Sequence, residues 1–188
     1  MFKIAAATLL ALGLAMPAVA EITAIRAGRV ITDAAQPARG ASTILVENGR
    51  IIEINDAAAA LPAGAKVIDL SGKTVMPGLI DAHVHLTGTP DSQFWQEAVT
   101  TDEYSVAVGL ANAATTLRAG FTTVRDLGSG RLSGFAVRDA IANGIATGPR
   151  TLVSGPAISI IGGHGDVSGY RPEVHAAPSP RRLGAHGS

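Results

Sequence analysis

The stretch that decides the fold is Val75-Met76-Pro77-Gly78-Leu79-Ile80-Asp81-Ala82-His83-Val84-His85. An apolar run of strand length follows a Pro-Gly turn pair and ends in two histidines two positions apart. Because strand residues two apart point to the same side, the two imidazoles should lie side by side, with Asp81 on that side one step deeper. Such a pair suits either a metal such as zinc or ordinary hydrogen bonds at a strand end.

Residues 21–73, upstream of this stretch, have the pattern of short strands and turns. The β-rich runs are residues 22–32, 42–47, 50–54 and 67–70. Asn48-Gly49 separates two of these runs, and this pair is a strong hairpin signal because both residues tolerate positive φ. We expect three or four strands in a small sheet, followed by a turn at Ser71-Gly72-Lys73.

Downstream of the stretch, strand and helix patterns alternate. Apolar residues repeat at helical spacing up to Gly120, and Thr100 with Glu103 has the spacing of a capping box. A strand is expected at 121–127, a second helix at 133–143 and a third strand at 151–154. This order is typical of parallel strands covered by helices, as in a (β/α) barrel or a doubly wound sheet. Residues 176–188 lack apolar periodicity and predict an irregular tail.

Composition excludes several classes of partner and site. Fifteen Lys and Arg balance fifteen Asp and Glu, so nucleic acid is not an expected partner. Hydrophobic residues make up 47% of the chain, which is enough to bury a core. The sequence has no cysteine, so a metal would have to be held by histidine and carboxylate ligands.

Residues 1–20 have the features of a secretory signal peptide. Lys3 precedes an apolar segment at residues 4–16, and Ala18-Val19-Ala20 gives a small-x-small cleavage pattern before Glu21. The apolar segment is shorter than the roughly 20 residues that span a bilayer. We therefore expect an exported protein, periplasmic or secreted, with no stable membrane anchor.

The stretch at 75–85 resembles the first barrel strand of the metal-dependent amidohydrolase superfamily, in which the His-x-His pair supplies the first two metal ligands. Residues 120–126 are similar to the second barrel strand of that superfamily. Residues 148–166 are similar to the third strand and its loop in the imidazolonepropionase-like and prolidase-like branch. The resemblance implies a small β-sandwich portion at 21–73 and a partial barrel at 74–175, comprising the first three βα units of a (β/α)8 (TIM) barrel.

What the resemblance implies chemically is hydrolysis of C-N bonds in amides, cyclic amides or dipeptide-like substrates. His83 and His85 would bind one of two divalent metals, most simply zinc, and a metal-activated water would attack the scissile carbonyl. The remaining family ligands, a lysine, two histidines and an aspartate, cannot be assigned in this chain. A phosphotriester or lactone hydrolase on the same scaffold, and a non-catalytic remnant or binding module, are the alternatives.

Three further residues are site candidates with open roles. His164, in a glycine-rich loop, is either a substrate contact or a histidine bonded to backbone. Asp81 and Asp126 are candidates for carboxylates that orient the ligand histidines. Asp126 could instead pair with Arg125 or with a helix terminus.

The length of 188 residues is the main anomaly of the sequence. A complete barrel needs about 250 residues, so we expect an N-terminal fragment, whether truncated, interrupted or frameshifted. An open sheet edge would favour self-association, and two metal ligands alone would leave the chain inactive.

Overall fold

A computed structural model describes residues 21–92, 96, 99–163, 181 and 182. The chain divides into two compact units between Pro77 and Gly78, and each is described separately. No helix in the described part of the chain is both long and apolar enough to cross a membrane. The expected signal peptide at residues 1–20 lies outside the described residues.

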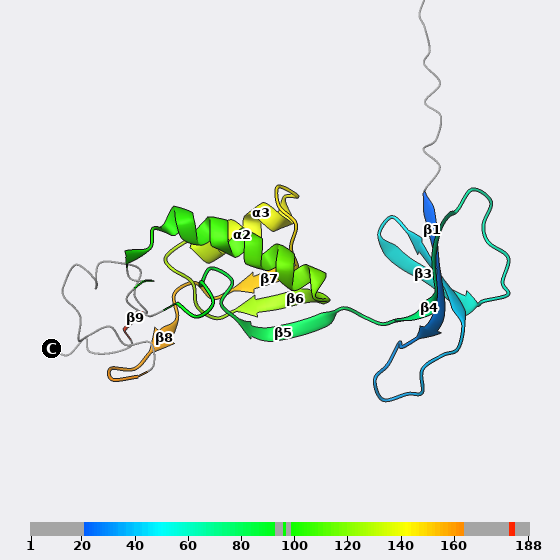
Figure 1. The fold of residues 1–188 in the computed structure, drawn as a ribbon, viewed down its shortest axis with the longest axis horizontal. Coiled ribbons are helices and arrows are strands. Elements are labelled where there is room, and N and C mark those ends of the chain that lie inside the picture. The colour runs from blue at the N-terminus through cyan, green and yellow to red at the C-terminus, as the bar shows by residue number, and fades with distance from the viewer. Residues whose placement is uncertain (1–20, 93–95, 97–98, 164–180, 183–188) are drawn as a thin grey trace, which may run out of the picture. The chain divides into compact units, whose positions relative to one another are not determined.

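The first unit is a four-stranded sheet in the order β3-β2-β1-β4 (Figure 1). Its strands are β1 (Ile22–Val30), β2 (Ser42–Glu47), β3 (Arg50–Asp56) and β4 (Lys66–Val75). β2 pairs antiparallel with both β1 and β3, whereas β4 pairs parallel with β1. Buried Ala27, Val30 and Ile44 form its core. The small sheet expected from the sequence is therefore present.

The hairpin between β2 and β3 turns at Asn48 and Gly49. Their φ angles are 49° and 74°, and the β2–β3 register runs from Glu47 opposite Arg50. Two consecutive residues with positive φ are what a two-residue hairpin of the primed type requires. The hairpin predicted from Asn48-Gly49 is confirmed.

The turn predicted at Ser71-Gly72-Lys73 is wrong, because these residues lie inside β4. The β1–β4 register jumps from Ala27 opposite Leu70 to Arg29 opposite Thr74, so three residues of β4 face Gly28 alone. Asp69 Oδ1 accepts a hydrogen bond from the Ser71 backbone N–H at 2.9 Å. Ser71, Gly72 and Lys73 thus form a bulge, and β4 pairs with β1 both before and after it.

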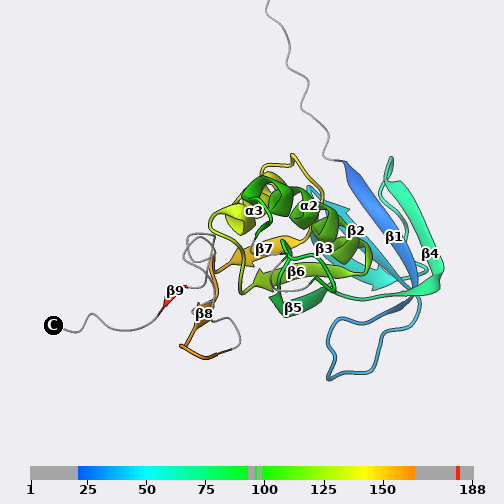
Figure 2. The same ribbon diagram turned by 60° about the vertical axis from the view of Figure 1, so that its left-hand side comes forward.

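The second unit contains a three-stranded parallel sheet in the order β5-β6-β7. Its strands are β5 (Leu79–Val84), β6 (Phe121–Asp126) and β7 (Arg150–Val153). The helices α2 (Asp102–Arg118) and α3 (Ser133–Ala142) lie on one side of the sheet, as Figure 2 shows. The β-α-β-α-β order and the parallel α/β fold expected from the sequence are present.

The core of the second unit lies between the sheet and the helices. Val124 of β6 is fully buried together with Ala113 of α2 and Val137 of α3, and Leu86 completes this cluster. The opposite side of the sheet is open, since Ile80 of β5 is 72% exposed and Leu152 of β7 is 53% exposed. Only one face of this sheet is covered by the described residues.

Helix α2 begins one residue later than the capping-box spacing predicts. Its N-cap is Thr101, whose Oγ1 accepts a hydrogen bond from the Tyr104 N–H at 3.3 Å. The Thr100 hydroxyl instead donates to the Gln96 carbonyl at 2.6 Å. Gly120, with φ of 99°, ends the helix as expected, and its N–H donates to the Leu117 carbonyl.

A short parallel pair joins β8 (Ile158–Ser159) to β9 (Arg181–Arg182). Two residues of the predicted irregular tail are therefore in a strand. A strand of two residues is too short to leave a periodic pattern in the sequence. The sequence therefore predicted an irregular tail where β9 lies.

Replacing Gly28 should loosen the first unit, because a Cβ at this position would overlap the Ser71 carbonyl oxygen. We expect Gly28→Ala to cost about 1–3 kcal/mol, the usual penalty when added atoms must displace backbone. Hydrogen exchange of the β1 and β4 amides measures the effect. Gly40→Ala is the matched control, since a Cβ at residue 40 would have no heavy atom within 4 Å. Equal protection in the two variants would contradict the close approach.

Candidate metal centre

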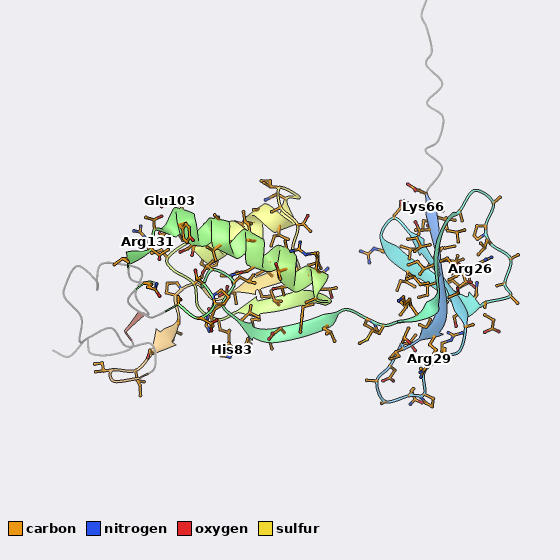
Figure 3. The ribbon with its side chains drawn as sticks, viewed as in Figure 1. Arg26, Arg29, Lys66, His83, Glu103 and Arg131 are labelled. Atoms are coloured by element: carbon orange, nitrogen blue, oxygen red, sulfur yellow. The ribbon has the colours of Figure 1, made fainter. Side chains whose placement is uncertain are left out.

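The two histidines lie where β5 ends and its following loop begins. His83 belongs to β5, and His85 is the first residue after Val84, the last residue of the strand. Figure 3 shows His83 close to the carboxyl end of β5. Both side chains are exposed. In parallel α/β folds this end of the sheet is where ligands bind.

The imidazole rings of His83 and His85 are close enough to share one cation. Their Nε2 atoms lie 3.3 Å apart, and the ring planes meet at 74° with centroids 5.2 Å apart. Two nitrogens on a tetrahedral zinc, with bonds of about 2.0–2.1 Å, are separated by about 3.3–3.4 Å. The separation of the two nitrogens therefore fits a shared zinc ion without rearrangement.

The tautomer of His85 is set by a carbonyl group. Its Nδ1 lies 2.9 Å from the Gly128 carbonyl oxygen. Because a carbonyl can only accept, Nδ1 carries the proton, and in the neutral ring the Nε2 lone pair is left for a cation. Metal-binding histidines are oriented in this way by a carbonyl or carboxylate partner.

Gly128 brings this carbonyl close to the ring because it has no side chain. A Cβ at residue 128 would lie 3.1 Å from the Cε1 and Nδ1 atoms of His85, and 3.0 Å from the Ala157 Cβ. Any larger residue would have to displace the ring or the loop after β7. No pattern in the sequence singles out Gly128, because its partner is 43 positions away.

Asp126 fixes the backbone next to His85 and next to the carbonyl that contacts the His85 ring. Its fully buried carboxylate accepts hydrogen bonds from Leu86 N–H at 2.9 Å and from Gly128 N–H at 3.0 Å. Burial raises the pKa of Asp126, while these two hydrogen bonds and His85 act in the opposite direction. Of the three roles considered from the sequence, pairing with Arg125 is wrong, because the Arg125 Nε donates to the Ala82 carbonyl instead.

Asp81 contacts the backbone of the histidine strand. Its Oδ1 accepts a hydrogen bond from the His83 N–H at 3.0 Å. The carbonyl of the same peptide unit, that of Ala82, accepts from Arg125 at 3.0 Å. Sequence reasoning considered Arg125 only as a partner of Asp126, because the register between β5 and β6 could not be read from the sequence.

The described residues bring two candidate metal ligands together, His83 and His85. Nowhere in residues 21–92, 96, 99–163 and 181–182 do three or more His, Cys, Asp or Glu side chains gather in a group that could hold a metal. His83 and His85 thus remain a candidate half-site of two residues. The predicted candidate His164 lies outside the described residues.

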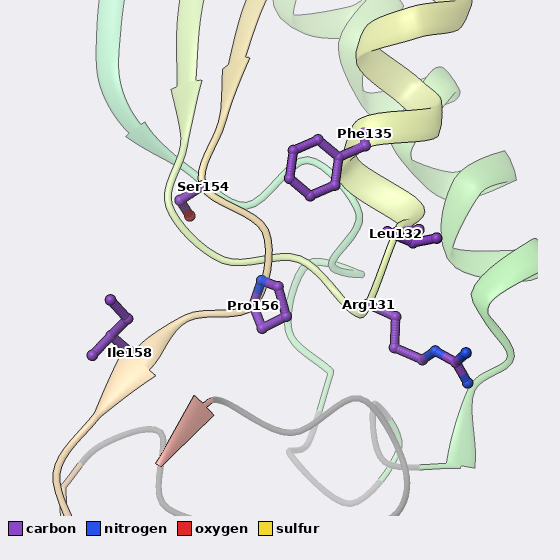
Figure 4. A pocket seen from close by; sticks show the side chains of 6 residues that line it. All are labelled: Arg131, Leu132, Phe135, Ser154, Pro156 and Ile158. Carbon is purple, nitrogen blue, oxygen red and sulfur yellow. The ribbon is translucent and has the colours of Figure 1, made fainter. Parts of the chain in front are cut away.

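A pocket of about 520 Å³ opens beside the loops that follow β6 and β7. Figure 4 shows its lining, which is mainly apolar: Arg131, Leu132, Phe135, Ser154, Pro156 and Ile158. The two loops are joined by a hydrogen bond from Ser129 N–H to the Gly155 carbonyl at 3.1 Å. The pocket is therefore built on the same loop pair that contacts His85 through Gly128. Its lining comes from two loops, from Phe135 of α3 and from Ile158 of β8, so no single periodic pattern in the sequence pointed to it.

Comparison with known proteins shows which family the chain resembles. The amidohydrolase family model matches residues 74–178. Ochratoxinase from Aspergillus niger is 32% identical over 175 residues, which cover 89% of this chain and 34% of the relative. Dihydroorotase from Geobacter sulfurreducens is 44% identical over 90 residues, covering 48% of this chain and 20% of the relative.

Solved structures agree with these matches. The structure of a Xaa-Pro dipeptidase with bound methionine aligns with a TM-score of 0.71 and 29% identity, covering 80% of this chain and 37% of that chain. The structure of the Aspergillus niger ochratoxinase aligns with a TM-score of 0.72 at 24% identity, covering 88% of this chain and 42% of that chain, which shows the shared fold. The chain spans about a fifth to about two fifths of the length of these proteins.

Replacing Asp126 by Asn should destabilise the second unit by about 1–3 kcal/mol, the usual cost of an unpaired buried donor. Both carboxylate oxygens accept a backbone N–H, so the amide nitrogen of Asn would face one of these donors. Chemical denaturation monitored by the exchange of the Leu86 and Gly128 amides measures the loss. Asp139→Asn serves as the control, because its carboxylate is exposed and contacts Arg138 at the surface. If both variants unfold at the wild-type denaturant concentration, Asp126 does not have this role.

Proposed function

Because the chain belongs to the amidohydrolase family, we propose that it supplies the first metal-binding strand of a metal-dependent hydrolase of C-N bonds. The substrates would be amides, cyclic amides or dipeptide-like molecules. Its three parallel strands would be the first three βα units of a (β/α)8 barrel, and zinc is the metal that we propose. The activity of the whole protein is part of this proposal, since the chain spans only a fraction of its relatives.

The separation of 3.3 Å between the Nε2 atoms of His83 and His85 carries the proposal. Two neutral imidazoles at this distance are suited to a common cation. The carbonyl of Gly128 supports the required tautomer of His85. In the metal-free chain the His83 Nε2–H can donate to the His85 Nε2 lone pair, and a bound cation would take the place of this proton.

A bound divalent metal would lower the pKa of a water molecule and polarise the scissile carbonyl. The residues of this chain have supporting tasks in that chemistry. His83 and His85 would occupy two coordination positions of the metal. Asp126 and Gly128 keep the His85 ring aligned. The mainly apolar pocket would receive an apolar group of the substrate, against Leu132, Phe135 and Pro156.

In a form of the protein that carries the complete barrel, His83→Ala and His85→Ala should each lower amide hydrolysis more than about a hundredfold. Loss of a direct ligand should exceed the roughly 10–100-fold effect of outer-shell groups. A chelator should abolish hydrolysis of N-acyl amino acids and dipeptides, and zinc should restore it. The 188-residue chain alone should be inactive, because it supplies two ligands of the three or four that a zinc site uses.

The control for this experiment is Arg50→Ala, an exposed position in β3 of the first unit. Its activity and melting temperature should equal those of the wild type. Hydrolysis that survives chelation, or that is unaffected by both histidine substitutions, would exclude the proposed mechanism.

We also propose that the protein is exported, on the strength of the charged start, apolar run and Ala18-Val19-Ala20 pattern of residues 1–20. The mature protein should begin at Glu21. Intact-mass measurement of protein recovered from the periplasm or the medium tests this expectation. Ala18→Arg should block cleavage, because the cleavage site accepts small residues. Recovery of the uncleaved chain from the cytoplasm in both cases would contradict export.

A further inference from the structure

The strand that carries the histidines is irregular where His83 lies. The β5–β6 register changes from Asp81 opposite Val124 to Val84 opposite Asp126. Ala82 and His83 therefore share one partner position, that of Arg125. An extra residue of this kind bends a strand and redirects its side chains, and bulges of this type are common beside active sites.

Both polar groups of the peptide at this bulge are bonded to charged side chains. The His83 N–H donates to Asp81 Oδ1, and the Ala82 carbonyl accepts from Arg125 Nε, both at 3.0 Å. Hydrogen bonds in which one partner is ionised are stronger than neutral ones. The plane of the Ala82–His83 peptide is thus held from both sides by groups of opposite charge.

The two rings of the half-site are oriented by different means. His85 is held at its ring, by the Gly128 carbonyl. The direction of the His83 side chain depends on the backbone from which it starts, and the bulge peptide sets that backbone. Arg125 reaches this peptide from the central strand β6, which also carries Asp126.

We propose that Arg125 is a positioning residue for the histidine pair: by holding the Ala82 carbonyl it fixes the bulge that places Nε2 of His83 3.3 Å from Nε2 of His85. This inference deepens the proposed function and rests on it for its metal. The guanidinium is suited to the task because it is planar and donates along a fixed direction.

The test compares Arg125→Met, Arg125→Lys and Arg150→Met in the 188-residue chain. Methionine keeps an unbranched stem but loses the donor, and lysine keeps one charged donor. Arg150 is the matched control, because it is an exposed arginine on the neighbouring strand β7 of the same sheet. The dissociation constant for Co²⁺ is measured from its visible absorption, and thermal melting reports folding.

Arg125→Met should weaken Co²⁺ binding at least about tenfold, the lower end of the effect of outer-shell groups. Arg125→Lys should recover most of the affinity, and Arg150→Met should leave it unchanged. Wild-type affinity in Arg125→Met, or the same loss in Arg150→Met, would overturn the proposal. Should Arg125→Met fail to fold, Arg125→Gln takes its place, since its shorter side chain keeps a polar amide but cannot span the same distance.

A second measurement tests the role of Arg125 in the absence of metal. The ¹⁵N shifts of the His83 and His85 imidazoles are recorded in the metal-free chain, together with exchange of the His83 amide. Arg125→Met should shift the His83 ring signals and speed the exchange, while the Asp126-bonded amide of Leu86 stays protected. If the wild-type chain binds no Co²⁺, two ligands are too few to hold the metal here, and the metal function is decided in the form that carries the complete barrel. Unchanged His83 signals in Arg125→Met would overturn the role of Arg125 whether or not Co²⁺ binds.

Discussion

The buried carboxylate of Asp126 is the interaction on which the histidine end of the second unit depends. It joins the end of β6 to the residue after His85 through Leu86, and to the residue whose carbonyl holds the His85 ring through Gly128. The backbone and the ring of one histidine are therefore fixed by the same side chain. Such a group must be fully hydrogen-bonded, because a buried polar group without partners costs free energy. The two N–H donors meet that condition and make the carboxylate a rigid support.

In the described part of the second unit, one face of the sheet is covered by helices and the other is exposed. Toward α2 and α3, the sheet buries Val124 against Ala113 and Val137. On the other face Ile80 and Leu152 stay largely in solvent. In an eight-stranded barrel, side chains of alternate strands fill the interior in layers. The proposal that β5, β6 and β7 begin such a barrel thus gives these apolar residues a place, and it puts the remaining metal ligands on strands that would face His83.

Elements with a local signal could be predicted, whereas pairings between distant segments could not. Asn48-Gly49 identified its hairpin, and Gly120 marked the end of α2. Both predictions used residue types that adopt positive φ readily, so they needed no information about distant segments. The bulges at residues 71–73 and 82–83 were not foreseen, since each depends on which residue of another strand lies opposite. The same limit applies to the site. The spacing of His83 and His85 indicated a pair, but the contacts of Arg125 with Ala82 and of Gly128 with His85 each join residues 43 positions apart.

The hydrogen bonds that align the histidines lie within one short part of the chain. They join residues at most 43 positions apart, and all of them lie between Asp81 and Gly128. Loop closure over such a distance costs little additional entropy. A chain that ends anywhere beyond the loop after β6 would therefore still contain every group that aligns the two histidines.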